Sequence, residues 1–257
     1  IRLVRMGRVP YRWALHRMQQ MALARRRNEL EDTLLLVEHP PVITLGRAGG
    51  SEDVLAPPTL LRALGIEVVQ TERGGRATYH GPGQLVAYPI LRLRPCDLHA
   101  YLRRLEDVVL DVLAEWGIAG QRVERYPGVW AGSDKIAAVG VAVEEGVATH
   151  GVALNVDPDM RHFSLIVPCG LAGHGVTSMR ARLGWAVPLE AVERAFVRAF
   201  ARVFARPIGS RGEPGPWLVV PAASAAAGTV EGLTDELGLH TVCQAAACPN
   251  TGECWSR

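Results

Sequence analysis

The sequence predicts an α+β fold, in which two or three helices pack on a mixed, mostly antiparallel sheet. Two observations point to this class: short apolar runs bounded by glycine or proline, and longer segments in which apolar residues recur at helical spacing. With 257 residues, 48% of them hydrophobic, the chain is long enough to bury a sizeable core. We expect a main domain over residues 1–210 and a separate segment over residues 211–257.

The expected elements follow one another along the main domain. Helices are predicted over 10–30, 97–116 and 189–204, and the second begins at Asp97, a residue type that often accepts the first free N–H groups of a helix. The predicted strands are the apolar runs at 33–37, 42–45, 66–69, 85–90, 129–131, 135–143 and 148–156. Glycine-containing turns at 132–134 and 145–146 separate the last three strands.

Charge and hydropathy exclude several classes of function. The net charge is +2, and because residues 213–257 hold five acidic residues and one arginine, residues 1–212 carry about +6. A mildly basic domain favours acidic protein partners. Its arginines are scattered and rarely interleaved with aromatic residues, which is not typical of a nucleic-acid interface. No apolar run reaches the roughly 18 residues of a membrane span, so we expect a cytoplasmic protein, although Ile1 in place of Met indicates that the true start is missing.

Residues 73–84 form a glycine-rich stretch between two apolar runs. The stretch contains four glycines, a Tyr, a His and two arginines, Arg73 and Arg76. Glycines allow the backbone to approach a ligand closely, and exposed N–H groups beside arginines suit a carbonyl, a carboxylate or a phosphate. A glycine-rich surface turn is the alternative interpretation.

Of the 28 basic residues, Lys135 is the single lysine. Codon bias toward arginine explains the scarcity of lysine, but lysine can give or take a proton where arginine cannot. Lys135 begins a predicted strand in which Ala137, Ala138 and Gly140 leave room for an apolar chain. A tightly packed contact between sheet and helix would explain the same small residues.

Cys169 lies between Pro168 and Gly170, in a predicted turn. A buried cysteine is usually a small hydrophobic residue, whereas a nucleophilic one needs a cation or a base to lower its pKa. Lys135 can provide that group, with amides of the glycine-rich stretch as donors to an oxyanion. The sequence alone does not bring the two residues together.

Four motifs together resemble the lipoyl(octanoyl) transferases in order and in spacing. They are residues 73–84, residues 128–130 followed by 135–136, residues 149–155, and residues 168–171 followed by 175–178. The resemblance extends from about residue 3 to 205 and implies the fold of biotin and lipoate protein ligases. It also implies transfer of an octanoyl or lipoyl group from acyl carrier protein to a specific lysine of lipoyl domains, in 2-oxoacid dehydrogenases and the glycine cleavage H protein. This reaction is the first step of endogenous lipoate biosynthesis and needs no cofactor.

The resemblance also implies roles for individual residues. Cys169 matches the thiol that carries the acyl group as a thioester, and Lys135 matches the residue that lowers the pKa of that thiol. Lys135 is then also the natural base for the acceptor amine. His80 and His150 either assist this proton transfer or pack as polar residues. The implied substrate-binding residues are Arg73, Gly74, Gly75, Arg76, Ala77, Thr78, Tyr79, His80, Ala138, Val139, Gly140, Gly151, Val152 and Ala153. An ATP-dependent lipoate or biotin protein ligase is the alternative activity, against which the Pro-Cys-Gly turn argues. A non-enzymatic scaffold would leave the glycine-rich stretch without a purpose.

The segment 211–257 departs from this family. After a linker rich in proline and alanine, Cys243, Cys248 and Cys254 follow the spacing C-x4-C-x5-C, which is similar to the opening of lipoyl synthase. The resemblance makes these thiols candidate ligands of a 4Fe–4S cluster, and zinc is an alternative occupant. We expect a truncated fusion, and the alternatives are a gene-boundary artefact or a retained fragment without function. Any cluster would be labile because no surrounding barrel shields it.

Overall fold

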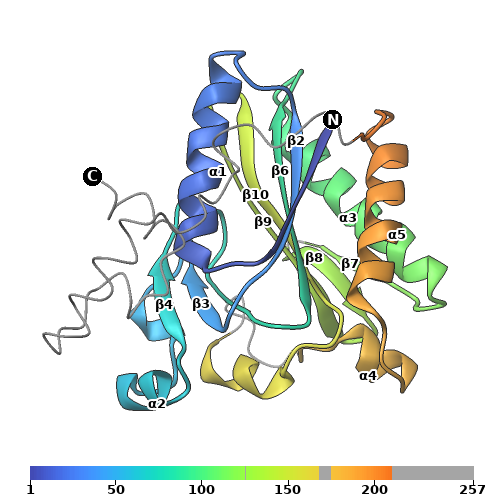
Figure 1. Ribbon diagram of the computed structural model, residues 1–257. Coiled ribbons are helices and arrows are strands. Elements are labelled where there is room, and N and C mark those ends of the chain that lie inside the picture. Colours follow the sequence, from blue (N-terminus) through green and yellow to red (C-terminus); the bar gives the residue numbers. More distant parts are fainter. Residues whose placement is uncertain (125, 168–174, 210–257) are drawn as a thin grey trace, which may run out of the picture. The chain divides into compact units, whose positions relative to one another are not determined.

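A computed structural model describes residues 1–124, 126–167 and 175–209. Contacts within the chain divide it into two units, Ile1–Arg211 and Gly212–Arg257, and the described residues all belong to the first. This unit contains a seven-stranded sheet and a three-stranded sheet (Figure 1). None of the helices in the described ranges is long and apolar enough to cross a membrane.

The seven-stranded sheet forms the centre of the unit. In spatial order its strands are β1 (Arg2–Arg8), β2 (Thr33–Glu38), β6 (Gln84–Arg92), β10 (Val147–Asn155), β9 (Asp134–Glu144), β8 (Tyr126–Ala131) and β7 (Gln121–Val123). β1 runs parallel to β2, and every other neighbouring pair is antiparallel. The α+β class with a mixed, mostly antiparallel sheet is therefore confirmed.

Helices cover both faces of this sheet. Helix α1 (Tyr11–Arg26) packs on β6 and β10, whereas α3 (Leu98–Glu115) and α5 (Leu189–Val203) pack together on the opposite face (Figure 1). Because both faces are covered, β2 and β6 are buried along nearly their whole length, which explains their continuous apolar runs. The carboxylate of Asp97 accepts the N–H of Ala100 at 2.9 Å, so the predicted start of α3 is confirmed.

The second sheet was not predicted. It consists of β4 (Glu67–Gln70), β3 (Val42–Leu45) and β5 (Ala77–His80), with β3 parallel to β4 and antiparallel to β5. β5 lies inside the glycine-rich stretch, which the sequence presents as a loop. This segment forms a strand because the buried ring of Tyr79 packs on Phe163 and completes a small second core against this sheet.

Several short elements also lie outside the predicted set, because segments of three to seven residues show too little periodicity to be recognised. Besides β1, β5 and β7, they are α2 (Pro58–Ala63), α4 (Met179–Leu183), and the 3-10 helices η1 (Ser51–Asp53) and η2 (Met160–Leu165).

Candidate active site

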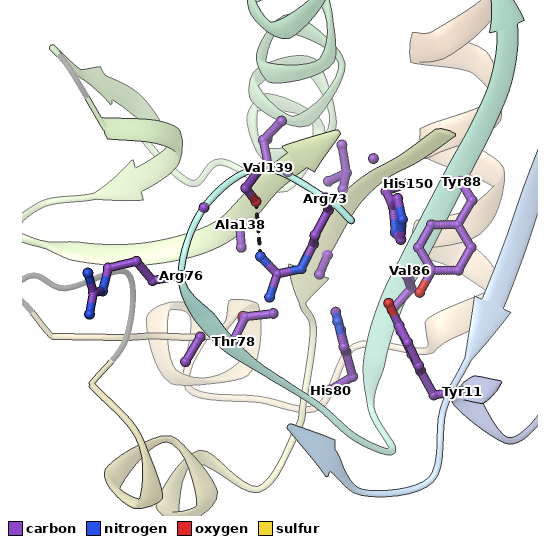
Figure 2. A pocket seen from close by; sticks show the side chains of 17 residues that line it. Tyr11, Arg73, Arg76, Thr78, His80, Val86, Tyr88, Ala138, Val139 and His150 are labelled. Carbon is purple, nitrogen blue, oxygen red and sulfur yellow. Dashed lines mark hydrogen bonds between the residues drawn. The ribbon is translucent and has the colours of Figure 1, made fainter. Parts of the chain in front are cut away.

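A cavity lies between β9, β10 and the glycine-rich stretch (Figure 2). Its lining is mostly apolar and aromatic, with a few polar groups, which is typical of a site for a small ligand. The lining residues are Tyr11, Arg73, Gly74, Gly75, Arg76, Ala77, Thr78, His80, Val86, Tyr88, Ala138, Val139, Gly140, His150, Gly151, Val152 and Ala153.

Small residues on two adjacent strands make the floor of this cavity. Ala138 of β9 lies opposite Ala153 of β10, and Gly140 lies opposite Gly151 in the next pair on the same face. Alternate residues of a strand share a face, so two consecutive small pairs leave a hollow in the sheet. The sequence indicated the small residues of β9, and strand pairing places Gly151 and Ala153 of β10 opposite them.

The glycine-rich loop forms the rim and is held mainly by its own arginines. The buried guanidinium of Arg73 donates to the carbonyl oxygen of Thr44 at 2.7 Å. It also donates to the carbonyl oxygen of Gly74 at 3.0 Å (Figure 2). Arg76 points away from the aromatic side of the cavity and pairs with Asp53 at 2.8 Å and Glu52 at 3.0 Å. Both guanidinium groups therefore hold the loop in place, and both residues also line the cavity.

The loop backbone differs from expectation in two respects. The N–H of Gly74 donates to Val141 at 2.9 Å and so is already used within the protein. Positive φ angles occur at Gly75 (+90°) and Gly83 (+86°) but not at Gly74 or Gly81. Two of the four glycines thus adopt a backbone conformation that residues with a side chain rarely adopt.

His80 ends β5 and begins a chain of buried hydrogen bonds. The amide nitrogen of Asn155 donates to the carbonyl of Thr177 at 3.0 Å, so its oxygen is free to accept from Gln84 at 2.8 Å. Gln84 also donates to the carbonyl of Tyr79, which leaves its oxygen to accept from Nδ1 of His80 at 2.7 Å. His80 therefore carries its proton on Nδ1. Burial keeps the pKa of His80 well below its usual value, so Nε2 holds a lone pair.

Aromatic side chains from distant parts of the chain meet beside His80. His39 donates from Nδ1 to the carbonyl of Val9 at 2.8 Å, and its Nε2 lies 2.9 Å from the hydroxyl of Tyr88. Burial lowers the pKa of His39 to about 4. The ring of Tyr11 stacks on His80 with 5.8 Å between centroids and meets His39 edge-on at 5.2 Å. No motif in the sequence marks Tyr11, Val86 or Tyr88 as lining residues, although a tyrosine inside an apolar run signals a buried hydroxyl that needs a partner.

His150 lies in β10 with an unusual backbone for a residue with a side chain. Its φ is +56°, and its N–H donates to the sulfur of Met18 at 3.2 Å. Burial lowers the pKa of its imidazole, and Nε2 lies 3.5 Å from the carboxylate of Glu72, which acts in the opposite direction. This left-handed conformation, held in a buried position beside the cavity, is the kind of strain found at functional sites.

Lys135 is the second residue of β9 and is 7% exposed. Its Nζ donates to the carbonyl of Pro127 at 3.2 Å and lies 5.0 Å from the ring centroid of Trp130. Its backbone bonds to the segment that follows residues 168–174, through its N–H to Gly175 and its carbonyl to the N–H of Thr177, both at 2.9 Å. Lys135 is not among the residues that line the cavity.

The predicted site residues are therefore distributed as follows. Thirteen of the fourteen implied substrate-binding residues line the cavity, and the exception is Tyr79, whose ring lies in the second core. Cys169 and the cysteines at 243, 248 and 254 lie outside the described residues. Within the described ranges, no three His, Cys, Asp or Glu side chains are grouped so that they could hold a metal ion.

Comparison with known proteins agrees with this geometry. The model of the lipoyl protein ligase A/B catalytic domain matches residues 10–201. An octanoyltransferase from Rubrobacter xylanophilus is 50% identical over 193 residues, which are 74% of this chain and 87% of that protein.

Two solved structures share the fold. A bi-partite lipoate protein ligase from Thermoplasma acidophilum has a TM-score of 0.65 at 19% identity, over 98% of this chain and 96% of that one. Biotin protein ligase from Aquifex aeolicus has a TM-score of 0.50 at 14% identity, over 79% and 70%. The biotin and lipoate protein ligase fold is thus confirmed, and the chain belongs to the lipoyl protein ligase A/B catalytic-domain family.

Proposed function

We propose that this acyltransferase, which transfers octanoyl groups in lipoate biosynthesis, takes the acyl group from acyl carrier protein and passes it through a thioester on Cys169. The acceptor is the amine of a specific lysine on a lipoyl domain, as in 2-oxoacid dehydrogenases and the glycine cleavage H protein. Relatives named octanoyltransferase support the acyl group, and the hollow of small residues supports an apolar chain as the ligand.

The observation that carries the mechanism is the position of Lys135. This single lysine is buried, and its backbone bonds to the residues that follow segment 168–174. At the other end of that segment, the N–H of Val167 donates to the carbonyl of Asp53 at 2.8 Å, and Asp53 also binds Arg76 of the cavity rim. Both flanks of the cysteine-bearing segment are thus attached to the site, which supports pairing of Cys169 with Lys135.

The chemistry proceeds in two acyl transfers. The ammonium group of Lys135 favours the thiolate of Cys169. This thiolate attacks the thioester carbonyl of the donor and releases the carrier thiolate, which takes up the proton of the Lys135 ammonium and leaves Lys135 neutral. The acceptor amine next loses a proton and attacks the new thioester, and the amide forms as the Cys169 thiolate leaves. Exchange of one thioester for another is nearly balanced and amide formation is downhill, so no ATP is required.

The second transfer needs a group that accepts the proton of the acceptor amine. Lys135 is the natural base once it is neutral. Among the described histidines that line the cavity, His80 is the better assistant, since its Nδ1 donates to Gln84 and its Nε2 therefore holds the lone pair. The Nε2 of His150 lies 3.5 Å from the carboxylate of Glu72, which suits a packing role.

The test is the intact mass of the protein after incubation with octanoyl carrier protein in the absence of ATP. We expect a gain of one octanoyl group in the wild type, no gain in Cys169→Ser and a slower gain in Lys135→Arg. Cys96→Ser is the matched control, since Cys96 is exposed and outside the cavity. An adduct that requires ATP and free octanoate would refute this mechanism and identify a ligase.

We further propose that the transferase domain spans residues 1–210, and that residues 211–257 are a linker followed by a partial lipoyl synthase-like segment. The division of the chain near residue 211 and the C-x4-C-x5-C spacing support this boundary. A fragment of residues 1–210 is expected to form the acyl adduct at the wild-type rate. Anaerobic reconstitution of the full chain, compared with a variant in which Cys243, Cys248 and Cys254 are alanine, tests whether those thiols bind iron and sulfide.

A further inference from the structure

Glu106 is a buried carboxylate that the proposed mechanism does not use. It lies on α3 and is 1% exposed, among the apolar residues that this helix packs against the sheet. Burying a carboxylate is unfavourable unless its oxygens are paired and hydrogen-bonded. Its Oε2 accepts from Arg103 at 2.7 Å and from Arg122 at 3.0 Å, whereas Oε1 accepts the N–H of Gly128 on β8 at 2.9 Å.

The N–H that Glu106 accepts belongs to the same peptide unit as the carbonyl that binds Lys135. Nζ of Lys135 donates to the oxygen of Pro127 at 3.2 Å, and the N–H of that peptide is the N–H of Gly128. In a trans peptide the N–H and C=O groups point in opposite directions. One planar unit therefore joins the carboxylate of Glu106 to the ammonium of Lys135, and hydrogen bonds in such a chain polarise one another.

The peptide is held in this orientation by its own geometry. Gly128 has a φ of +131°, and a methyl group at its Cα would lie 2.6 Å from the carbonyl oxygen of Ala137 and 3.3 Å from Cε of Lys135. Glycine is required at this position because no other residue fits the conformation and the space together.

We propose that Glu106 is a positioning residue, which orients Lys135 and favours its charged form through the peptide between Pro127 and Gly128. The proposal rests on the role of Lys135 in the proposed function. Among the described residues, Arg103 and Arg122 bind the other oxygen of Glu106, and Asp134, which precedes Lys135, pairs with Arg182 at 2.6 Å. Removing the charge of Glu106 leaves both arginines in place, so the peptide that binds Lys135 then faces two guanidinium groups without their shared carboxylate.

The single lysine makes this proposal directly measurable. Protein labelled with 13C at lysine Cε gives one side-chain lysine signal, which belongs to Lys135 without further assignment. In Glu106→Gln the amide oxygen can still accept from Gly128, so the variant removes the charge while keeping the hydrogen bond. We expect the pH dependence of this signal in Glu106→Gln to move to lower pH than in the wild type, and the pH profile of acyl-adduct formation to move with it.

The matched control is Asp107→Asn. Asp107 follows Glu106 on α3 and pairs with the same Arg122, but Glu106 rather than Asp107 accepts from Gly128. This variant should leave both the lysine titration and the pH profile unchanged. Glu106→Asp keeps the negative charge and should therefore change both less than Glu106→Gln does.

An unchanged lysine titration in Glu106→Gln, whether or not the protein loses thermal stability, would overturn the proposal and leave Glu106 a purely structural residue. Failure of the proposed function is distinguishable, because the wild type would then form no acyl adduct while the lysine signal still reported on Glu106.

Discussion

Ala138 offers the most direct test of where the acyl chain lies. Ala138 faces Ala153 on the cavity floor, where both side chains are small. Replacing it with leucine adds three carbons to that floor and displaces about three methylenes of a bound octanoyl chain. At about 0.8 kcal/mol for each methylene, the loss is about 2.4 kcal/mol, or about 60-fold in kcat/KM for octanoyl relative to butanoyl substrate. A butanoyl chain is short enough to keep its rate.

The assay is the second-order rate constant of adduct formation with octanoyl and butanoyl carrier proteins, measured below saturation and expressed as the ratio of the two constants. Ala142→Leu is the control, because Ala142 lies on the same face of β9 but outside this cavity. An unchanged ratio in Ala138→Leu, with thermal stability intact, would show that the chain does not run over Ala138. An equal change in Ala142→Leu would show that the effect does not come from the cavity.

Three further predictions concern the scaffold of the site. Burial places the pKa of His39 at about 4 in the folded protein, below the 6.5 of the unfolded chain. The stability that depends on neutral His39 should therefore be fully present above pH 6.5 and fall on acidification, by about 2 kcal/mol at pH 5. Urea unfolding at pH 7 and pH 5 measures the loss, and a pKa above 6 for His39 by NMR would contradict it. In Gly151→Ala the new methyl would lie 2.4 Å from the carbonyl oxygen of Ala87, so the free energy of unfolding in urea should fall by about 1–3 kcal/mol. The control is Gly209→Ala, where a methyl meets nothing within 4 Å and the stability should stay near that of the wild type. Asp97→Ala removes the cap of α3 and should lower stability by about 1 kcal/mol, whereas Asp97→Asn should retain most of it.

Sequence reasoning succeeded where a pattern is local and long enough to repeat. Helix α3 shows both its apolar spacing and its capping residue, so its start at Asp97 was predicted correctly. The small residues of β9 are also local, and they indicated a hollow. Their partners on β10 were identified as site residues only through the family resemblance, because strand pairing is a long-range property that no window of sequence contains.

Other parts of the site depend on topology alone. Tyr11, His39 and Tyr88 come from α1, the turn after β2, and β6, and they meet only because those elements pack together. β5 was concealed by the glycines around it, and its strand pairing with β3 is what turns Thr78 and His80 toward the cavity and Tyr79 away from it.

One signal in the sequence nevertheless leads to these hidden groups. Tyr88 lies inside a continuous apolar strand, and Glu106 lies next to Leu105 on the apolar face of α3. A polar side chain at a core position must find a hydrogen-bond partner, because burying it alone is unfavourable. Tyr88 meets His39 beside the cavity, and Glu106 meets the peptide that binds Lys135. Polar residues at positions where the pattern calls for apolar ones therefore point to the network that supports the site, even where no motif marks them.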